Sequence, residues 1–105
     1  MINNKIVGLL GLATKAGVII AGTDASIECI ESKKAKLVLI SEEASEKTKK
    51  NFEFICNKNF IPIVIWGSIE TLSKAIGKNN KAIICIRDKN FAGEIYKLIY
   101  GREIV

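Results

Sequence analysis

Two short runs of hydrophobic residues constrain the fold of this chain more than any other feature. The runs are Leu37–Ile40 and Ala82–Ile86. Because successive side chains of a strand point to opposite faces, a strand without polar positions has to be covered on both faces. Segments with helical spacing of apolar residues lie before, between and after these runs. The order α-(β)-α-β-α-β-α-β-α therefore predicts an α/β fold, a three-layer α/β/α sandwich with a central sheet of about four strands.

Glycines and capping residues predict where the elements begin and end. We expect a first helix from Asn3 or Asn4 to about Ala16, with a left-handed C-cap at Gly17. The other expected helices are a short one after Gly22, one over residues 42–57, one from an N-cap at Ser68 to Gly77, and one over residues 91–100. The expected strands cover residues 18–20, 36–41, 61–66 and 82–86, with Pro62 confined to the start or edge of its strand.

Residues 21–40 form the unit around which the rest of the chain is organised. Gly22 can adopt backbone angles that are closed to other residues, and a helix follows it. We expect the side chain of Thr23 or Asp24 to cap that helix. The helix end brings unpaired N–H donors and a positive dipole end to the surface, where phosphate or the edge of a nucleobase binds readily.

Length and charge set broad limits on the partners of the chain. Its 105 residues are enough for one domain, over residues 1–105, with a core of its own. Hydrophobic residues make up 49% and aromatics only 7%, so the core should be aliphatic. The net charge of +5 favours anionic partners, but it fits a solvated lysine-rich surface equally well.

The residue inventory argues against an enzyme. The sequence has no histidine, which removes the commonest general base and the commonest transition-metal ligand. No G-x-S-x-G or G-x-G-x-x-G motif occurs, and the carboxylate pairs, such as Glu42 and Glu43, fall on expected helix surfaces. We therefore expect no catalytic residues, no metal and no cofactor.

Three cysteines and the absence of long apolar segments indicate the compartment. Cys29, Cys56 and Cys85 are widely spaced in apolar stretches and form no C-x-x-C motif, which is typical of small buried hydrophobes in a reducing compartment. The apolar run Ile6–Ala13 is too short for a membrane span and fits a core helix better than a signal peptide. A cytoplasmic location without a membrane partner is expected.

A set of lysines is the remaining functional signal. Lysines contact phosphates as point charges, with little sequence preference. No stacking platform of aromatic residues accompanies them, since Trp66 is the only tryptophan and lies at a strand end. Structured RNA, recognised by shape and backbone, suits this inventory better than a single strand. The lysines concerned are Lys15, Lys33, Lys34, Lys36, Lys78 and Lys81.

Four blocks in a fixed order carry a resemblance to a known family. They are G-L-L-G-L-A-T-K-A-G, A-G-T-D, K-A-K-L-V-L-I-S-E-E-A-S and I-P-I-V-I-W-G-S-I-E-T-L-S-K-A-I-G-K. Together they resemble the kink-turn-binding ribosomal-protein superfamily of the seven-Ae and thirty-e type, and the first block is most similar to its small bacterial YlxQ-type branch. The resemblance implies an α/β/α sandwich that binds RNA, typically a kinked internal loop, and associates with ribosomes or other ribonucleoproteins.

The recognition motif of that superfamily maps onto the start of the second expected helix. Its glycine and the following small residue correspond to Gly22 and Thr23. The asparagine, glutamate and lysine of the motif are replaced by Asp24, Ala25 and Glu28. Asp24 keeps an acceptor but loses the amide donors, Ala25 cannot accept a hydrogen bond, and Glu28 reverses a charge. We therefore expect RNA binding by a related face with a different specificity.

The sequence thus predicts a non-enzymatic RNA-binding protein. Its expected partner is structured RNA, kink-turn-like or ribosomal, with the ribosome itself as a further candidate, and no DNA. An adaptor of the same fold that binds proteins and has lost kink-turn recognition is the alternative, and a small-molecule or regulatory α/β domain is a weaker one. The predicted RNA-binding residues are Gly22, Thr23, Asp24, Lys33, Lys34, Lys36, Lys78 and Lys81.

Overall fold

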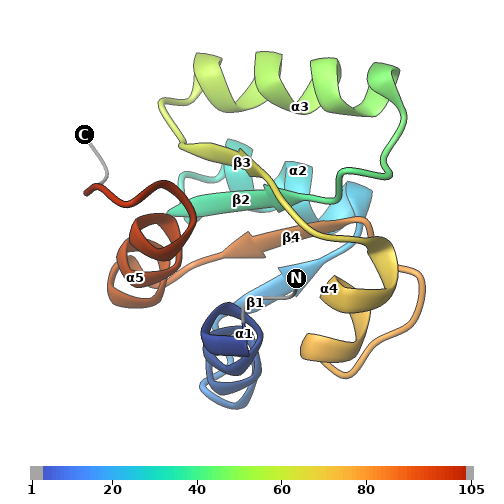
Figure 1. The fold of residues 1–105 in the computed structure, drawn as a ribbon. Helices are drawn as coiled ribbons and strands as arrows, with labels where there is room; N and C mark the ends of the chain where they lie inside the picture. Colours follow the sequence, from blue (N-terminus) through green and yellow to red (C-terminus); the bar gives the residue numbers. More distant parts are fainter. Residues whose placement is uncertain (1–3, 104–105) are drawn as a thin grey trace.

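One mixed sheet lies at the centre of the fold. The computed structural model describes residues 4–103, and within that range four strands pair in the order β1-β4-β2-β3 (Figure 1). Strand β4 runs antiparallel to β1 and β2, whereas β2 and β3 are parallel. The strands are β1 (Ile19–Ala21), β2 (Leu37–Ile40), β3 (Ile63–Ile65) and β4 (Ile83–Ile86). The predicted central sheet of about four strands is confirmed.

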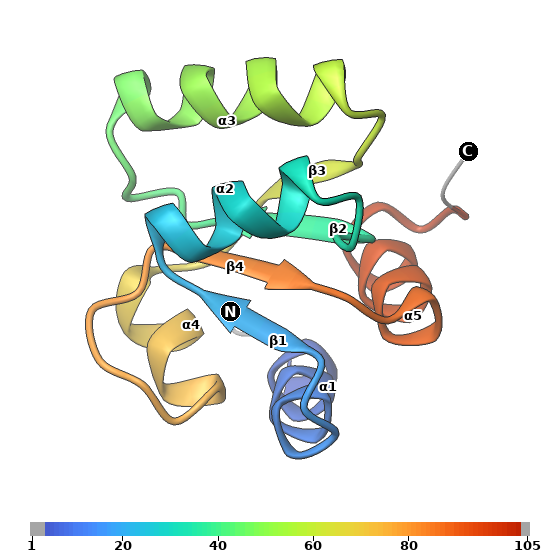
Figure 2. The ribbon, with the colours of Figure 1, turned by 180° about the vertical axis from the view of Figure 1, so that it is seen from behind.

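Helices cover both faces of this sheet. The helices are α1 (Asn4–Lys15), α2 (Thr23–Glu31), α3 (Glu46–Lys58), α4 (Ile69–Ala75) and α5 (Lys89–Tyr100). Figures 1 and 2 show α2 and α3 on one side of the sheet and α1, α4 and α5 on the other. The predicted three-layer sandwich is therefore confirmed.

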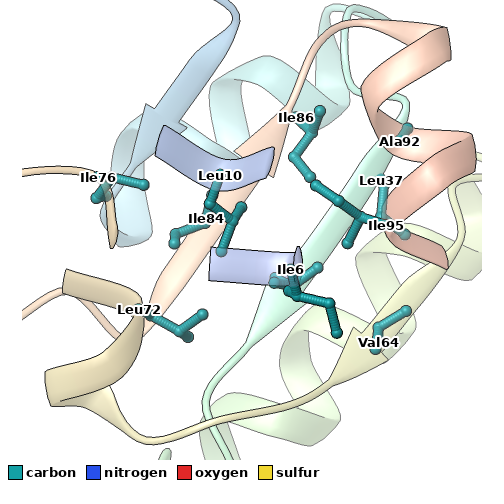
Figure 3. Close-up of a cluster of buried hydrophobic side chains, with 11 residues drawn as sticks. Ile6, Leu10, Leu37, Val64, Leu72, Ile76, Ile84, Ile86, Ala92 and Ile95 are labelled. Atoms are coloured by element: carbon teal, nitrogen blue, oxygen red, sulfur yellow. The ribbon is translucent and has the colours of Figure 1, made fainter. Parts of the chain in front are cut away.

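The alternation of side chains along β2 and β4 explains why these strands are entirely apolar. Leu37 and Leu39 belong to the cluster under α1, α4 and α5, while Val38 and Ile40 belong to the cluster under α2 and α3. Figure 3 shows the first cluster, in which Ile6 and Leu10 of α1 lie against the sheet. Each fully buried Leu or Ile contributes on the order of 1.5–3 kcal/mol. A polar residue in either strand would therefore lie inside one of two cores.

The three cysteines meet in the second cluster. The Sγ atoms of Cys85 and Cys29 lie 3.1 Å apart, and Cys56 of α3 is buried in the same cluster. Burial raises the pKa of the Cys56 thiol to about 12. Burial, and next the hydrogen bond to Cys29, also raise the pKa of Cys85. The cysteines are small buried hydrophobes, as predicted.

Two helix starts differ from the sequence prediction. Neither Thr23 nor Asp24 caps α2: the N-cap is Gly22, which has no side chain, and Thr23 is already helical. Helix α3 begins at Glu46 rather than at residue 42, with Ser45 as its N-cap. The delay arises because the side chain of Ser41 accepts a hydrogen bond from the Glu43 N–H and holds residues 41–44 in a turn.

Other ends shift by smaller amounts. Helix α5 begins at Lys89, two residues early, because Asp88 accepts a hydrogen bond from the Phe91 N–H and caps it. The predicted cap at Ser68 is confirmed by its hydrogen bond from the Thr71 N–H. Helix α1 begins at Asn4, while Asn3, the other expected cap, lies outside the described residues. Strand β3 covers only the middle of the expected range 61–66.

One lysine of α3 does not point to solvent. Lys47 and Lys50 are exposed, but Lys49 is half-buried. Its Nζ donates to the carbonyl oxygen of Glu42 at 2.8 Å and lies 3.5 Å from a carboxylate oxygen of Glu46. The late start of α3 causes this, since residues 42–44 fold back beside its first turns.

Over residues 4–103 there is no helix with the length and apolar character that a membrane span requires.

Candidate nucleic-acid interface

The start of α2 is fixed by the sheet beneath it. The N–H of Gly22 donates to the carbonyl of Ile83 at 3.0 Å, which extends the β1–β4 pairing by one residue. The carbonyl of Gly22 then accepts from the Ser26 N–H at 3.1 Å and begins the helix. Gly22 makes this change of direction with φ 101° and ψ 163°, angles that are strained for any residue with a side chain.

The first turn of α2 lies open to solvent. Thr23, Asp24 and Ala25 are all exposed, and no side chain caps the helix. The first N–H groups of a helix have no acceptor within it, and they coincide with the positive end of its dipole. Such an end binds an anion or an acceptor on a base edge. The carboxylate of Asp24 stands in this first turn and lowers the positive potential there.

The loop before β4 meets this helix end. Figures 1 and 2 both show the α4–β4 loop on the same side of the molecule as the start of α2. A Cβ atom placed on Gly22 would lie 3.7 Å from Nζ of Lys81, so the ammonium group stands beside the glycine. The predicted residues Gly22, Thr23, Asp24 and Lys81 are thus brought together. We call these residues, with Lys78 of the same loop, the helix-end surface.

Ser73 holds the loop in this position. This serine of α4 is only 4% exposed. Its Oγ accepts a hydrogen bond from the Lys81 N–H at 2.8 Å and donates one to the Lys81 carbonyl at 3.2 Å. Its own carbonyl accepts from the Lys78 N–H at 2.9 Å. Sequence reasoning missed this residue, although a serine directly after the core position Leu72 was a visible signal.

The acidic side chains near the loop have partners of their own. Glu43 accepts a hydrogen bond from the Ile69 N–H at 2.8 Å, at the start of α4. Glu70 pairs with Lys74 at 2.9 Å, and the hydrogen bond from Lys74 lowers the pKa of Glu70. Within residues 4–103, Lys78 and Lys81 form no ion pair. Both ammonium groups are therefore available to an anion, although Glu43 and Glu70 line the same hollow as Lys78.

Three of the predicted lysines lie elsewhere. Lys33, Lys34 and Lys36 follow the C-terminus of α2, whose nine residues span about 13 Å. Lys33 has φ 65°, and its Nζ donates to the Asn59 side chain at 2.7 Å. The structure therefore divides the predicted residues into two groups at opposite ends of α2, and they do not form a single face.

Glu28, the last of the three altered positions of the recognition motif, lies between these two groups of residues. Glu28 is exposed one turn into α2. It lines a shallow hollow of about 190 Å³ together with Lys34 and Arg87. Arg87 is held there by a hydrogen bond from Nη2 to the Gly17 carbonyl at 2.8 Å. Glu28 therefore faces the second group of cations rather than Lys81.

Comparison with known proteins identifies the class. The profile of the ribosomal protein L7Ae/L30e/S12e/Gadd45 family matches residues 4–96, and the chain belongs to this family. Among individual relatives, the RNA-binding protein YlxQ of Bacillus subtilis is 35% identical over 91 residues, which cover 87% of this chain and 91% of the relative. The RNA-binding protein YlxQ of Enterococcus faecium is 35% identical over 97 residues, or 92% and 93% of the two chains.

Two solved structures have the same fold. A protein of unknown function from Bacillus halodurans superposes with a TM-score of 0.89 at 30% identity, covering 92% of this chain and 98% of its own. The 15.5kD RNA binding protein of Giardia lamblia gives a TM-score of 0.76 at 20% identity, covering 96% and 89%. The second likeness shows the fold alone.

Proposed function

We propose that this chain is a non-enzymatic, cytoplasmic RNA-binding protein that binds structured RNA at the helix-end surface. The observation that carries the proposal is the position of Lys81. Its ammonium group stands beside Gly22, at the uncapped start of α2. A phosphate bound there meets both a full positive charge and unpaired backbone N–H groups.

Family membership supports the same function. Both YlxQ relatives are named as RNA-binding proteins, and each matches more than four fifths of this chain. The helix-end surface has the donors and cations that phosphate binding needs. The only other polar side chains on it are the Thr23 hydroxyl and the Asp24 carboxylate. A function in binding, without catalysis, fits this set of residues.

The specificity of the surface differs from that of a standard kink-turn reader. Asp24 offers acceptors only, so it can bind an exocyclic amino group but not a base acceptor. Ala25 makes no polar contact through its side chain, and Glu28 repels a phosphate one turn further along α2. The RNA target therefore presents a donor edge opposite Asp24 and phosphates opposite Lys78 and Lys81. Ribosomal RNA and kink-turn-like stems are the two classes to test.

A charge-reversal pair tests the assigned surface. Lys78→Glu with Lys81→Glu should abolish binding of a kink-turn stem-loop or of ribosomal RNA at moderate salt. In the wild type, the two lysines should contribute roughly two units to the slope of log affinity against log salt. The matched control is Lys47→Glu with Lys50→Glu, two exposed lysines of α3 that make the same change in net charge. If both double variants lose the same amount of RNA affinity, the assigned surface is wrong. It is also wrong if Lys78→Glu with Lys81→Glu leaves RNA affinity unchanged.

The alternative function is a protein-interaction adaptor. The replacement of all three polar motif residues, at Asp24, Ala25 and Glu28, is the observation that favours it. Its binding should depend little on salt, because protein interfaces of ordinary composition lack the counterion release of nucleic acids. A partner bound with similar affinity at low and high salt would support the adaptor and contradict RNA binding.

A further inference from the structure

A phenylalanine at the far end of the molecule has no role in either core. Phe60 follows α3 and is 91% exposed. Its φ of 59° lies in the left-handed region, which costs an ordinary residue about 1–2 kcal/mol. The conformation itself belongs to the C-terminal cap of α3, in which the Phe60 N–H donates to the Asn57 carbonyl at 3.3 Å and the Ile61 N–H to the Cys56 carbonyl at 2.9 Å. Such a cap does not require a large apolar side chain that faces water, and the exposed ring makes Phe60 a candidate for contact with a partner.

Phe60 forms one wall of a groove that also contains cations. The groove has a volume of about 470 Å³ and lies between the α3–β3 connection and the start of α5. Lys36, before β2, and Lys89, in the first turn of α5, line it together with Phe60 and Pro62. In Figures 1 and 2 the α3–β3 connection and α5 lie toward the same edge of the sheet in both views. The groove thus combines an open aromatic face with two ammonium groups.

The groove lining carries charges of both signs, and its two lysines are open to an anion. Within residues 4–103, Lys36 and Lys89 form no ion pair. The groove also contains Glu94 and Glu103, and Glu103 lies 3.7 Å from Nζ of Lys97, outside the groove lining. Lys33 lies outside the lining, where its Nζ donates to the side chain of Asn59, the residue before Phe60.

We propose that this groove is a second RNA contact, which takes an unpaired nucleotide. The base stacks on the ring of Phe60, and the neighbouring phosphates lie at Lys36 and Lys89. The inference rests on the proposed function and extends it. It gives a role to Lys36, one of the three lysines after the C-terminus of α2 that the helix-end surface leaves out. Bound RNA then has a structured part at the start of α2 and a single-stranded part at the opposite end of that helix.

The test compares RNAs with and without a single-stranded extension. The probes are a kink-turn stem-loop, the same stem-loop with a tail at either end, and the tail alone. A tail of about ten nucleotides is suitable, because a strand rising about 3.4 Å per nucleotide then spans the 31 Å longest dimension of the molecule. The variants are Phe60→Ala, Phe60→Trp and, as the matched control, Phe54→Ala. Phe54 is 68% exposed on α3 but does not line the groove.

The expected result is specific to the tail. The tail should tighten binding to the wild type, and Phe60→Ala should remove this gain with a loss of about tenfold. Phe60→Trp should keep the gain, Phe54→Ala should keep it, and all variants should bind the plain stem-loop like the wild type. A gain from the tail that is unaffected by Phe60→Ala would overturn the inference, and so would no gain from the tail in the wild type.

Failure of the proposed function has a different signature. If the wild type does not bind the plain stem-loop or any other structured RNA, the helix-end surface is wrongly assigned. Binding of the tail alone that is lost in Phe60→Ala would then still support the groove. Absence of binding by the tail alone, together with no gain from it on the stem-loop, would overturn the groove even if Lys78→Glu with Lys81→Glu abolishes stem-loop binding.

Discussion

Two buried serines make opposite contributions at the scale of single residues. Ser26 of α2 is fully buried, and among residues 4–103 its Oγ has no hydrogen-bond partner. Ser73 of α4 is almost as buried, and its Oγ makes two hydrogen bonds to Lys81. A buried hydroxyl without a partner lowers stability, whereas one with partners raises it. The same chemical group is therefore a defect in one helix and a structural support in another.

Replacement of Ser26 should stabilise the protein. We expect Ser26→Ala to raise the free energy of unfolding by about 1 kcal/mol, because the substitution removes an unsatisfied group and introduces a better helix former. Urea denaturation of wild type and variant measures the change. A loss of stability of similar size would show that the hydroxyl has a partner in solution.

The positions of the helix ends show what can be predicted at the scale of elements. Apolar spacing and the glycines were sufficient to place all five helices, and the cap at Ser68 was evident from its hydroxyl before an apolar run. The late start of α3 was missed because the turn that follows Ser41 is fixed by a second hydrogen bond, from the Ser41 side chain to the carbonyl of Gly67, which is distant in sequence. Long-range hydrogen bonds of this kind leave no local pattern.

The loop before β4 provides a prediction at the same scale. Ser73→Ala should lower stability by about 1–3 kcal/mol, since the Lys81 N–H and carbonyl lose their partner. It should also weaken RNA binding, because Lys81 is no longer held beside Gly22, while Ser26→Ala should leave affinity unchanged. Titrations below the melting temperature of both variants measure this. Wild-type affinity in Ser73→Ala would mean that the loop keeps its position without the serine.

At the scale of the whole molecule, the layers were predictable and the arrangement of charges was not. Two strands without polar residues require cover on both faces, which leaves few folds other than a three-layer sandwich. The distribution of lysines over the surface depends on which element ends lie together. Lys81 reaches Gly22 only because β4 pairs with β1, a pairing between strands far apart in the chain. The separation of Lys33 from Gly22, by contrast, follows from the length of α2 alone.

Stability should fall in alkaline solution because of the buried thiols. The pKa of Cys56 rises from 9.0 to about 12 in the folded protein, so folding favours the protonated thiol. Its contribution is complete below pH 9 and is lost as the pH rises from 9 toward 12, at up to about 1.4 kcal/mol per pH unit. Denaturation from pH 8 to pH 10.5 should show a smaller slope in Cys56→Val than in the wild type. Equal slopes would show that this thiol is not protected.

The central claim is that the helix-end surface binds structured RNA. The most direct measurement is a titration of the wild-type protein against a kink-turn stem-loop, a plain duplex and ribosomal RNA at two salt concentrations. The protein should bind the stem-loop or ribosomal RNA more tightly than the duplex, and its affinity should fall steeply as salt rises. Absence of binding to all three RNAs at the lower salt concentration would contradict it.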